Sequence, residues 1–398
     1  MNKMKNTDDF NKNTIQEFTP QARTWAEIDT NALCHNISYV RRTLSRTSKL
    51  LAVVKADAYG HGAVQCAQIF LENGADWLGV ATVEEARQIR DAGIKAPILM
   101  LGFSDSSLFS YFISHNIRPA IFSFLQAKEF SDEAVRQNKK APFHIKMDTG
   151  MHRIGYDENS GFVKEISEIF QLPGIIPEGV FTHFAVADEI NPVSDEYTLA
   201  QFTRFQDMLS SLAAEGMHFS IRHVCNSAAL FRFPQMHLDM VRPGIVLYGM
   251  NPGECKIPEL IPAMSFKTKL VQLRNLSAGE TVSYGRRYCA SEDHLTGTIP
   301  VGYADGYSRG LTNIGEVLVK GQRAKLIGTI CMDQCMVNLS SIENPALYDE
   351  VTLFGTQKTA GKKTQIPIDE LAEKLQTIHY ELTCVVGKRV PRVYTKDR

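Results

Sequence analysis

The sequence predicts an α/β protein, a TIM (β/α)8 barrel followed by a C-terminal, mainly β domain. The chain has 398 residues, more than one hydrophobic core usually supports, so two domains are expected. Residues 23–256 contain eight apolar, strand-like runs, most of them separated by helix-period stretches, and eight parallel βα units make a TIM barrel. From about residue 257 the runs are short and alternating, with glycine turns between them, which indicates a β domain.

The barrel domain, residues 23–256, is predicted to open with a strand at 25–29 and a helix over 32–44, which Asp29 or Thr30 can cap. Helix-period stretches such as 84–92 and 198–215 then separate most of the strands. The eight predicted barrel strands cover residues 51–55, 76–81, 97–101, 118–122, 142–147, 176–183, 221–225 and 238–242.

The β domain, residues 257–398, is joined to the barrel by a segment with three prolines, as expected of an extended linker. Its predicted strands cover residues 265–273, 281–284, 297–300, 316–319, 324–330 and 351–354, and a helix is predicted over 368–376. Residues 1–22 are polar and lack the apolar core of a secretory signal, so we expect a disordered N-terminal tail.

Composition excludes several classes of partner. With 43 basic and 44 acidic residues, the net charge of -1 gives no general attraction to nucleic acid. No apolar run approaches the roughly 20 residues that a membrane span needs. The eight cysteines show no Cys-x-x-Cys pair, which favours a reducing, cytoplasmic compartment. We therefore expect a small-molecule substrate and no nucleic-acid partner, no membrane partner and no metal site.

Polar residues are predicted at the ends of several barrel strands. In a TIM barrel the carboxyl ends of the strands meet at one face, which carries the active site. The sequence therefore predicts that these side chains converge on one site. They are Lys55, Lys146 with Arg153 in the loop behind it, His183, Asn226 and Ser227, and Arg242.

Lys55 follows an apolar strand in which Leu51, Val53 and Lys55 share one face. A lysine at this position is partly desolvated, which favours the neutral, nucleophilic amine, although a lysine that keeps its charge in water is the alternative. The loops after the seventh and eighth strands commonly bind phosphate in this fold. Ser227 can cap a helix and Gly244 permits close approach of backbone amides, although each alone is also compatible with an ordinary cap or turn.

A lysine that faces two phosphate loops suggests pyridoxal 5'-phosphate, which proteins hold by a lysine and by its phosphate. The run 54–62, Val-Lys-Ala-Asp-Ala-Tyr-Gly-His-Gly, closely resembles the cofactor-lysine motif of bacterial alanine racemases. The resemblance extends from about residue 25 to residue 394. Further matching motifs lie at 146–153, 182–185, 226–228, 241–244, 282–285, 302–306 and 331–334.

The resemblance implies a cytoplasmic homodimer that interconverts L- and D-alanine, the latter a precursor of bacterial peptidoglycan. Lys55 is implied as one base and Tyr284, from the other subunit, as the base on the opposite face of the substrate α carbon. Racemisation needs two such bases. A free tyrosine is a poor base at neutral pH, so the proton of Tyr284 must pass into a hydrogen-bond network, for which His183 and Arg242 are the candidates. Arg242 would also face the pyridine nitrogen of the cofactor. Each residue also has a purely structural interpretation. Tyr284 could be a strand aromatic packed against its neighbours, and Arg242 could be a surface arginine at the end of a strand.

The remaining roles implied by the resemblance concern binding. Arg153 and Met332 would bind the substrate carboxylate, and Lys146 would be carried as a carbamate that braces Arg153. Tyr380 would narrow the substrate pocket, which favours alanine. The cofactor-binding set is Lys55, Tyr59, His183, Asn226, Ser227, Arg242, Gly244, Ile245 and Tyr380. The substrate corridor would be lined by Asp188, Tyr303, Arg309 and Ile378.

One position departs from the family pattern. Members often carry an arginine two residues before the Cys-Met-Asp run, whereas this chain has Thr329, so we expect altered substrate access. Two other functions are open to a barrel of this kind. A basic-amino-acid decarboxylase would profit from a carboxylate at the ring nitrogen, which Arg242 opposes. The second is a non-catalytic cofactor-binding protein, a class that resembles the barrel alone. The additional β domain, which carries Tyr284 and Met332, argues against this function.

Overall fold

A computed structural model describes residues 22–159 and 161–396, so the predicted tail lies outside the described residues apart from Ala22. The chain forms two compact units. Among the described residues, the barrel unit consists of 31–159, 161–264 and Gln376–Val386, and the sheet unit consists of 22–30, Ser265–Leu375 and 387–396. The chain therefore passes between the units more than once. The predicted boundary between residues 256 and 257 would have the chain pass between them once. In the described ranges, no helix is long and apolar enough to span a membrane.

The barrel unit is built on parallel strands, which confirms the predicted barrel. Two hydrogen-bonded paths, β10-β2-β3-β4-β5 and β6-β7-β8-β9, are continuous except at Pro119, which separates β5 from β6. Asp239 N donates to Arg222 O at 3.1 Å and Arg242 N donates to Cys225 O at 3.0 Å, which links β10 to β9 and closes the barrel. The strands are β2 (Lys49–Val53), β3 (Trp77–Val80), β4 (Ile98–Met100), β5 (Ile117–Arg118), β6 (Ala120–Ile121), β7 (Ala141–Lys146), β8 (Ile175–Phe181), β9 (Ile221–His223) and β10 (Met240–Val241).

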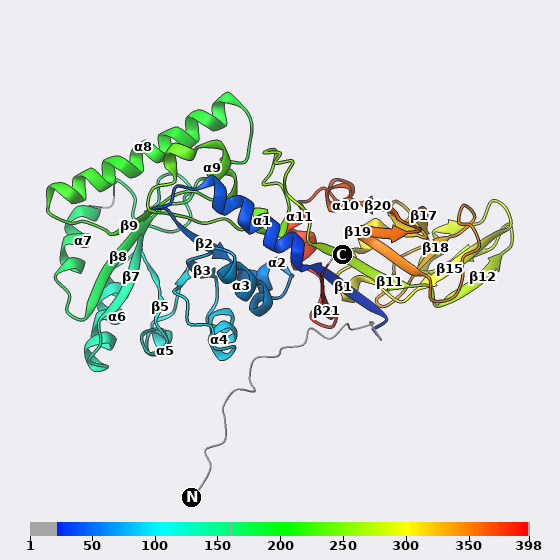
Figure 1. Ribbon diagram of the computed structural model, residues 1–398, viewed down its shortest axis with the longest axis horizontal. Coiled ribbons are helices and arrows are strands. Elements are labelled where there is room, and N and C mark those ends of the chain that lie inside the picture. The colour runs from blue at the N-terminus through cyan, green and yellow to red at the C-terminus, as the bar shows by residue number, and fades with distance from the viewer. Residues whose placement is uncertain (1–21, 160, 397–398) are drawn as a thin grey trace, which may run out of the picture. The chain divides into compact units, whose positions relative to one another are not determined.

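Helices lie outside these strands, as Figure 1 shows for α3 to α8. Helix starts follow their capping residues: the side chain of Thr82 accepts from Glu85 N at the start of α4, and that of Asn191 accepts from Ser194 N at the start of α8. The helices of this unit are α1 (Thr30–Thr43), α2 (Lys55–Tyr59), α3 (Ala63–Glu72), α4 (Val83–Asp91), α5 (Phe109–Ser114), α6 (Phe124–Arg136), α7 (Phe162–Phe170), α8 (Pro192–Ala214), α9 (Ser227–Arg232) and α11 (His379–Cys384).

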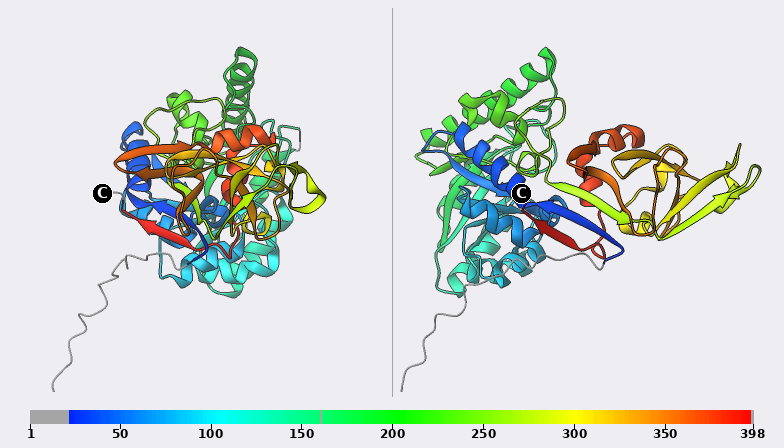
Figure 2. Two further views of the ribbon diagram at one scale, coloured as in Figure 1. Left: turned by 90° about the vertical axis from the view of Figure 1, so that its right-hand side faces the viewer. Right: turned by 45° about the vertical axis from the view of Figure 1, so that its right-hand side comes forward.

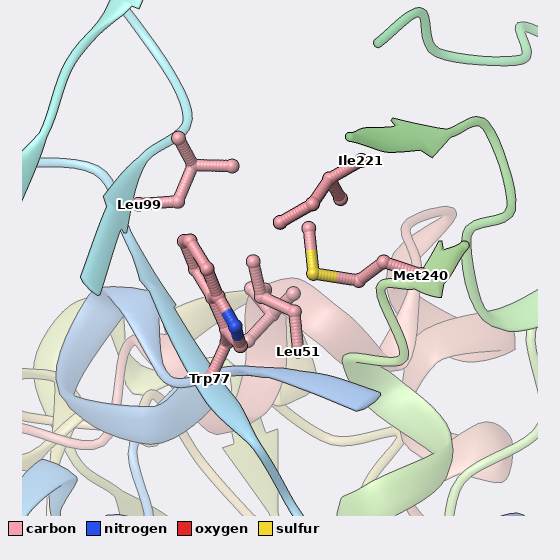
Figure 3. Packing of buried hydrophobic residues seen from close by; sticks show 6 residues of the cluster. Leu51, Trp77, Leu99, Ile221 and Met240 are labelled. Atoms are coloured by element: carbon pink, nitrogen blue, oxygen red, sulfur yellow. The ribbon is translucent and has the colours of Figure 1, made fainter. Parts of the chain in front are cut away.

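The barrel interior is filled by apolar side chains from strands far apart in the sequence. Figure 3 shows Leu51, Trp77, Leu99, Ile221 and Met240 pointing toward one another, and all five are buried. They come from β2, β3, β4, β9 and β10, so this cluster ties the first strands of the barrel to the last. The packed interior gives the strand ends a rigid support.

The sheet unit contains a ten-stranded sheet in the order β12-β15-β18-β17-β16-β19-β11-β1-β21, with β20 paired to β19. Figure 2 shows its yellow and orange strands from two further sides. The predicted strand at 25–29 is β1 (Thr24–Asp29), and it pairs in parallel with β21 (Arg392–Thr395), so it belongs to this sheet. The other strands are β11 (Met264–Lys269), β12 (Gln272–Leu276), β15 (His294–Ile299), β16 (Glu316–Val319), β17 (Gln322–Ile327), β18 (Cys335–Asn338), β19 (Glu350–Thr359) and β20 (Lys362–Ile366).

Two smaller features complete the sheet unit. The short strands β13 (Thr281–Val282) and β14 (Tyr288–Cys289) pair only with each other and carry a turn between them. Helix α10 (Ile368–Leu375) confirms the helix predicted over 368–376. The mainly β character predicted for this part of the chain is therefore confirmed.

Three strand ends differ from the sequence prediction. Strand β2 ends at Val53, and Lys55 begins α2, because Ala56, Asp57 and Ala58 adopt left-handed backbone angles with φ of 53°, 53° and 55°. The carboxylate of Asp57 then accepts a hydrogen bond from Ala63 N at 2.8 Å, which fixes this turn. His183 and Arg242 likewise follow β8 and β10 and do not end them, whereas Lys146 is the last residue of β7, as predicted.

Candidate active site

Lys55 lies in the turn after β2, where its amine is partly withdrawn from water. Burial lowers its pKa, and repulsion from Arg153 lowers it further, while Glu85 and Cys384 oppose the shift. The carboxylate of Glu85 accepts a hydrogen bond from the next backbone amide, Ala56 N, at 2.7 Å. A larger fraction of Lys55 is therefore neutral, and able to attack a carbonyl or accept a proton, than of a surface lysine at the same pH.

His183 lies among four cationic side chains. Burial lowers its pKa well below the usual value, followed by repulsion from Arg242, Arg153, Lys146 and Lys55. All four cations are close enough to His183 to repel its protonated form, so the structure brings together the predicted cations of the strand ends. We call Lys55, Lys146, Arg153 and Arg242 the cation cluster. In this field the imidazole of His183 is neutral at physiological pH.

Arg242 is buried and is held by hydrogen bonds to its guanidinium group. Its Nη2 donates to Thr182 O at 2.7 Å and to Val224 O at 3.0 Å, and lies 3.3 Å from His183 Nδ1. Its Nη1 lies 2.8 Å from His223 Nδ1. Burial lowers the pKa of Arg242 to about 10, so the side chain is still charged at neutral pH. The guanidinium is therefore a fixed hydrogen-bond donor.

His223 and His144 extend this network through the barrel, and sequence analysis missed both. Because arginine only donates, His223 accepts at Nδ1 and carries its proton on Nε2, which lies 2.8 Å from His144 Nδ1. Glu178 Oε2 lies 3.5 Å from His144 Nε2 and accepts from Arg118 Nε at 2.9 Å. The available signal was a histidine within each of two barrel strands, because a buried imidazole is costly unless it is hydrogen-bonded.

Lys146 is buried at the end of β7. Its Nζ donates to Met147 O and lies 5.5 Å from the centroid of the Phe181 ring. Burial lowers its pKa to about 7; Asp148 opposes the shift, and Arg242 and Arg153 reinforce it. A substantial fraction of the amine is thus neutral at neutral pH. The predicted repulsion between Lys146 and Arg153 is present in the structure.

Asp148 shapes the loop that carries Arg153, a role that sequence analysis did not assign. Its carboxylate accepts from Gly150 N at 2.9 Å, His152 N at 3.0 Å and Arg153 N at 2.8 Å. Burial raises its pKa, but these three backbone hydrogen bonds outweigh that effect, and the net pKa is lowered. The loop from 148 to 153 is therefore folded around a carboxylate that is ionised at working pH.

Tyr59, Ser227 and Gly244 meet after the last barrel strands, and we call them the hydroxyl cradle. Ser227 Oγ accepts from Gly244 N at 2.9 Å, and a Cβ added at Gly244 would lie 2.5 Å from Tyr59 Oη. Asn226 caps α9 by accepting from Ala229 N at 2.9 Å, so the prediction that Ser227 caps this helix is wrong. Ser227 is the first residue of α9, and its hydroxyl proton is directed away from Gly244. Ile245 begins the 3-10 turn Ile245–Tyr248.

Tyr380 lies on α11 beside the hydroxyl cradle. Its ring centroid is 6.2 Å from that of Tyr59. Burial raises the pKa of Tyr380, and the negative charge of Asp188 adds to the shift, so Asp188 lies nearby. Burial also raises the pKa of Tyr59. Both phenols are therefore neutral hydrogen-bond donors at physiological pH, and Ile378 stands exposed at the start of the same helix.

The sheet unit brings together the other predicted site residues around the segment 328–332. Tyr303 N donates to Cys331 O at 3.2 Å, which places Tyr303 beside Met332. Ile330 N donates to Thr312 Oγ1 at 3.2 Å, which anchors the segment to the end of the 3-10 turn containing Arg309. Tyr284 follows β13, and Thr329 Oγ1 donates to Tyr284 O at 2.7 Å. The side chains of Tyr284, Tyr303 and Met332 are exposed.

The residues of the hydroxyl cradle and the cation cluster fit a phosphorylated aldehyde cofactor. Two hydroxyl groups and a glycine that leaves no room for a side chain suit a phosphate. A lysine with a lowered pKa suits covalent attachment to a carbonyl carbon. Arg242 supplies a donor that stays charged. These features lie in one unit of the chain.

Comparison with known proteins covers nearly the whole chain. The family model described as the alanine racemase N-terminal domain matches residues 28–252, and that described as the alanine racemase C-terminal domain matches residues 263–394. An alanine racemase of Clostridium tetani is 44% identical over 378 residues, which are 94% of this chain and 95% of that protein.

Solved structures agree with this relation. The alanine racemase of Clostridium difficile 630 superposes with a TM-score of 0.89 at 37% identity, over 95% of this chain and 97% of that one. The alanine racemase of Bartonella henselae, whose structure contains covalently bound pyridoxal phosphate, gives a TM-score of 0.82 at 27% identity, over 94% of this chain and 100% of that one. The chain therefore belongs to the alanine racemase family.

Proposed function

We propose that this protein is a pyridoxal-phosphate-dependent isomerase that interconverts L-alanine and D-alanine with two bases, in an active site shared between two subunits. Family membership gives the reaction. The observation that supports the site most strongly is the convergence of Lys55, His183 and Arg242 in one electrostatic cluster at the strand ends of the barrel. The hydroxyl cradle lies in the same unit.

Pyridoxal phosphate, when bound, supplies an electron sink that stabilises negative charge on the substrate α carbon. Lys55 would attach it covalently, and Tyr59, Ser227, Gly244, Ile245 and Tyr380 would hold its phosphate. The lowered pKa of Lys55 and the close approach of Gly244 to Tyr59 support this assignment. The covalently bound pyridoxal phosphate of the Bartonella henselae enzyme supports it as well.

Lys55 and Tyr284 are proposed to exchange the α proton on opposite faces of the substrate. A neutral amine accepts a proton readily, and the lowered pKa of Lys55 increases the neutral fraction. His183, which is neutral in its field of cations, and Arg242, which donates to it, form the network to which the proton of Tyr284 would pass.

Arg242 is proposed to face the pyridine nitrogen. With a pKa of about 10 it remains protonated at working pH and so donates a hydrogen bond to that nitrogen. A donor at this position disfavours a proton on the ring nitrogen, which weakens the electron sink and favours return of the α proton over transamination. The hydrogen bonds to Thr182 O and Val224 O hold the guanidinium in place.

Arg153, together with Met332 of the other subunit, is proposed to bind the substrate carboxylate. Lys146 is proposed to carry a carbamate: the nitrogen lone pair bonds to the carbon of carbon dioxide, and the nitrogen loses a proton. A pKa of about 7 leaves enough neutral amine for this step at pH 7. The product is negatively charged, so it replaces the repulsion between Lys146 and Arg153 with attraction.

A homodimer is proposed because the sheet unit exposes apolar side chains at its candidate site residues. Tyr284 is 73% exposed and Met332 is 52% exposed, so both side chains are accessible to a partner subunit. We propose that they complete the site of the second subunit, with Tyr303 and Arg309 of the sheet unit and Asp188 and Ile378 of the barrel unit along the substrate corridor. Eight free thiols suit a cytoplasmic location.

The reaction is tested by giving the purified holoenzyme L-alanine, L-serine, L-arginine and L-lysine in separate reactions and resolving the products by chiral chromatography. D-alanine should form fastest, because Tyr380 narrows the pocket. Equal rates with all four substrates would contradict the alanine assignment. Release of carbon dioxide without a D-amino acid would contradict racemisation altogether.

A further inference from the structure

The turn that carries Tyr284 is strained at the residue before it. Ser283 has φ 64° and ψ -175°, a backbone conformation that glycine adopts readily and serine does not. Gly285 and Arg286, which follow Tyr284, also have positive φ, at 73° and 51°. Such strain persists only where the surroundings hold it, and it is concentrated at functional sites. Something must therefore hold this turn.

Two side-chain hydrogen bonds hold the strained turn, and we call them the Ser283–Thr329 clamp. Ser283 Oγ donates to Thr329 O at 2.6 Å, and Thr329 Oγ1 donates to Tyr284 O at 2.7 Å. Ser283 thus binds the backbone of the segment 328–332, and Thr329 binds the backbone of the Tyr284 turn. The side chain of Thr329 is 1% exposed, so water does not compete for its hydroxyl.

The segment that carries Thr329 is itself fixed from the opposite side. Gly328 N donates to Asn313 Oδ1 at 2.7 Å, and Ile330 N donates to Thr312 Oγ1 at 3.2 Å. A Cβ added at Gly328 would lie 2.8 Å from Val282 O, so this segment packs directly against the strand before the turn. Thr329 therefore offers a rigid point of attachment.

The side chain of Tyr284 gains little orientation from packing within its own chain, because 73% of it is exposed. The direction of its ring is therefore set mainly by the backbone turn. The altered substrate access predicted for Thr329 stays a prediction, and its buried hydroxyl has a further partner in the backbone of Tyr284.

We propose that Thr329 is a positioning residue for the Tyr284 base. Its hydroxyl fixes the carbonyl of Tyr284, which holds the strained turn and aims the phenol at the substrate α carbon. This inference rests on the proposed role of Tyr284. Proton transfer is sensitive to displacements of about 1 Å, so loss of the clamp should slow catalysis without removing any reacting group.

The test compares Thr329→Val, which removes the hydroxyl and keeps the shape, with Thr329→Ser, which keeps the hydroxyl. We expect kcat of Thr329→Val to fall about 10- to 100-fold, with KM and the cofactor absorbance near those of the wild type. Thr329→Ser should restore kcat. Thr329→Ala carries the same expectation as Thr329→Val if the valine does not fold.

Isotope effects separate positioning from a general structural defect. Because L- and D-alanine are equally stable, any variant lowers kcat/KM by the same factor in both directions. The size of this decrease therefore does not identify which base is affected. With substrates deuterated at the α carbon, Thr329→Val should raise the primary isotope effect only for the enantiomer whose proton Tyr284 removes. Tyr284→Phe, measured in parallel, should lose abstraction of that same proton and so identifies the enantiomer.

Thr296→Val is the matched control. Its hydroxyl is also buried in the sheet unit and donates to Arg274 O at 3.0 Å, away from the Tyr284 turn, so this variant should keep wild-type kinetics. The inference is wrong if Thr329→Val keeps the wild-type kcat and isotope effects while Tyr284→Phe loses abstraction from one face. It is also wrong if Thr329→Ser is as slow as Thr329→Val. Failure of the wild type to racemise alanine would overturn the proposed function and this inference together.

Discussion

At the scale of single residues, the site is a region where cations are crowded and partly dehydrated. Lys55, Lys146 and His183 all have lowered pKa values, with burial as the first cause and neighbouring cations as the next in Lys55 and His183. For folding this arrangement is unfavourable, because each group would be easier to protonate in the unfolded chain. It is useful for chemistry, because neutral amines and imidazoles accept protons and attack carbonyl carbon.

Lys146 gives a stability prediction at this scale. Its pKa is about 7 in the folded chain and 10.5 in the unfolded chain, so the unfolded state binds more protons between these values. The resulting destabilisation is complete below pH 7 and disappears as the pH rises toward 10.5. Lys146→Met should therefore stabilise the holoenzyme more at pH 6.5 than at pH 9.5, by at least about 1 kcal/mol, since one pKa unit corresponds to about 1.4 kcal/mol.

The measurement is the free energy of unfolding in urea at the two pH values, in buffers free of carbon dioxide so that the amine is unmodified. Lys128→Met is the matched control, because Lys128 is exposed and forms only a surface pair with Asp132 at 2.9 Å. Its effect should be small and similar at both pH values. If Lys146→Met changed the free energy of unfolding by the same amount at both pH values, the pKa of Lys146 would not be lowered by burial as described.

At the scale of elements, short turns after the barrel strands carry the residues proposed to react with or bind the substrate and cofactor. The left-handed turn of α2 carries Lys55, the Asp148 loop carries Arg153, and the segment after β10 brings Gly244 against Tyr59. Each turn is held by its own hydrogen bonds, so the strands provide support and the turns provide geometry.

Gly244 gives a prediction for one of these turns. Gly244→Ala places a Cβ 2.5 Å from Tyr59 Oη, so either Tyr59 or the turn must move away from the phosphate. The affinity for pyridoxal phosphate should fall at least about 10-fold, which corresponds to about 1.4 kcal/mol. Titration of the cofactor-free protein with pyridoxal phosphate, followed by absorbance, measures this change.

Gly102→Ala is the control for this substitution. Gly102 follows β4 in the same barrel, and an added Cβ there meets no atom within 4 Å. Its affinity for the cofactor should equal that of the wild type. If Gly244→Ala bound pyridoxal phosphate as tightly as Gly102→Ala does, the hydroxyl cradle would not be the phosphate site.

The sequence located the barrel strands and predicted the strand-end cations that gather around His183, because apolar periodicity and strand-end polarity are local signals. It placed Lys55 at the end of a strand because the alternation continues to that residue, and the left-handed turn at 56–58 leaves no periodic trace. It missed His223 and His144 because their partners, Arg242 and Glu178, are distant in sequence and meet only in the closed barrel. The cap at Asn226 was assigned to the next residue, which is within the usual uncertainty of helix ends.

At the scale of the whole molecule, the proposed site residues are divided between two units of the chain. Lys55, His183 and Arg242 belong to the barrel unit, and Tyr284 and Met332 belong to the sheet unit, where they are exposed. The proposed homodimer unites them by placing the sheet unit of one subunit at the barrel of the other. A single folded chain would then have an incomplete site, and activity would require association.

Subunit mixing tests this central claim most directly. Lys55→Ala and Tyr284→Phe should each be inactive as a homodimer, because every site lacks one base. When the two variants are dissociated, mixed in equal amounts and allowed to reassociate, half of the dimers are hybrids, and each hybrid holds one complete site. Racemase activity should then return to about a quarter of the wild-type value, as expected for random twofold pairing. A mixture that stays inactive although hybrids are detected by mass would contradict a site that takes Lys55 and Tyr284 from different subunits.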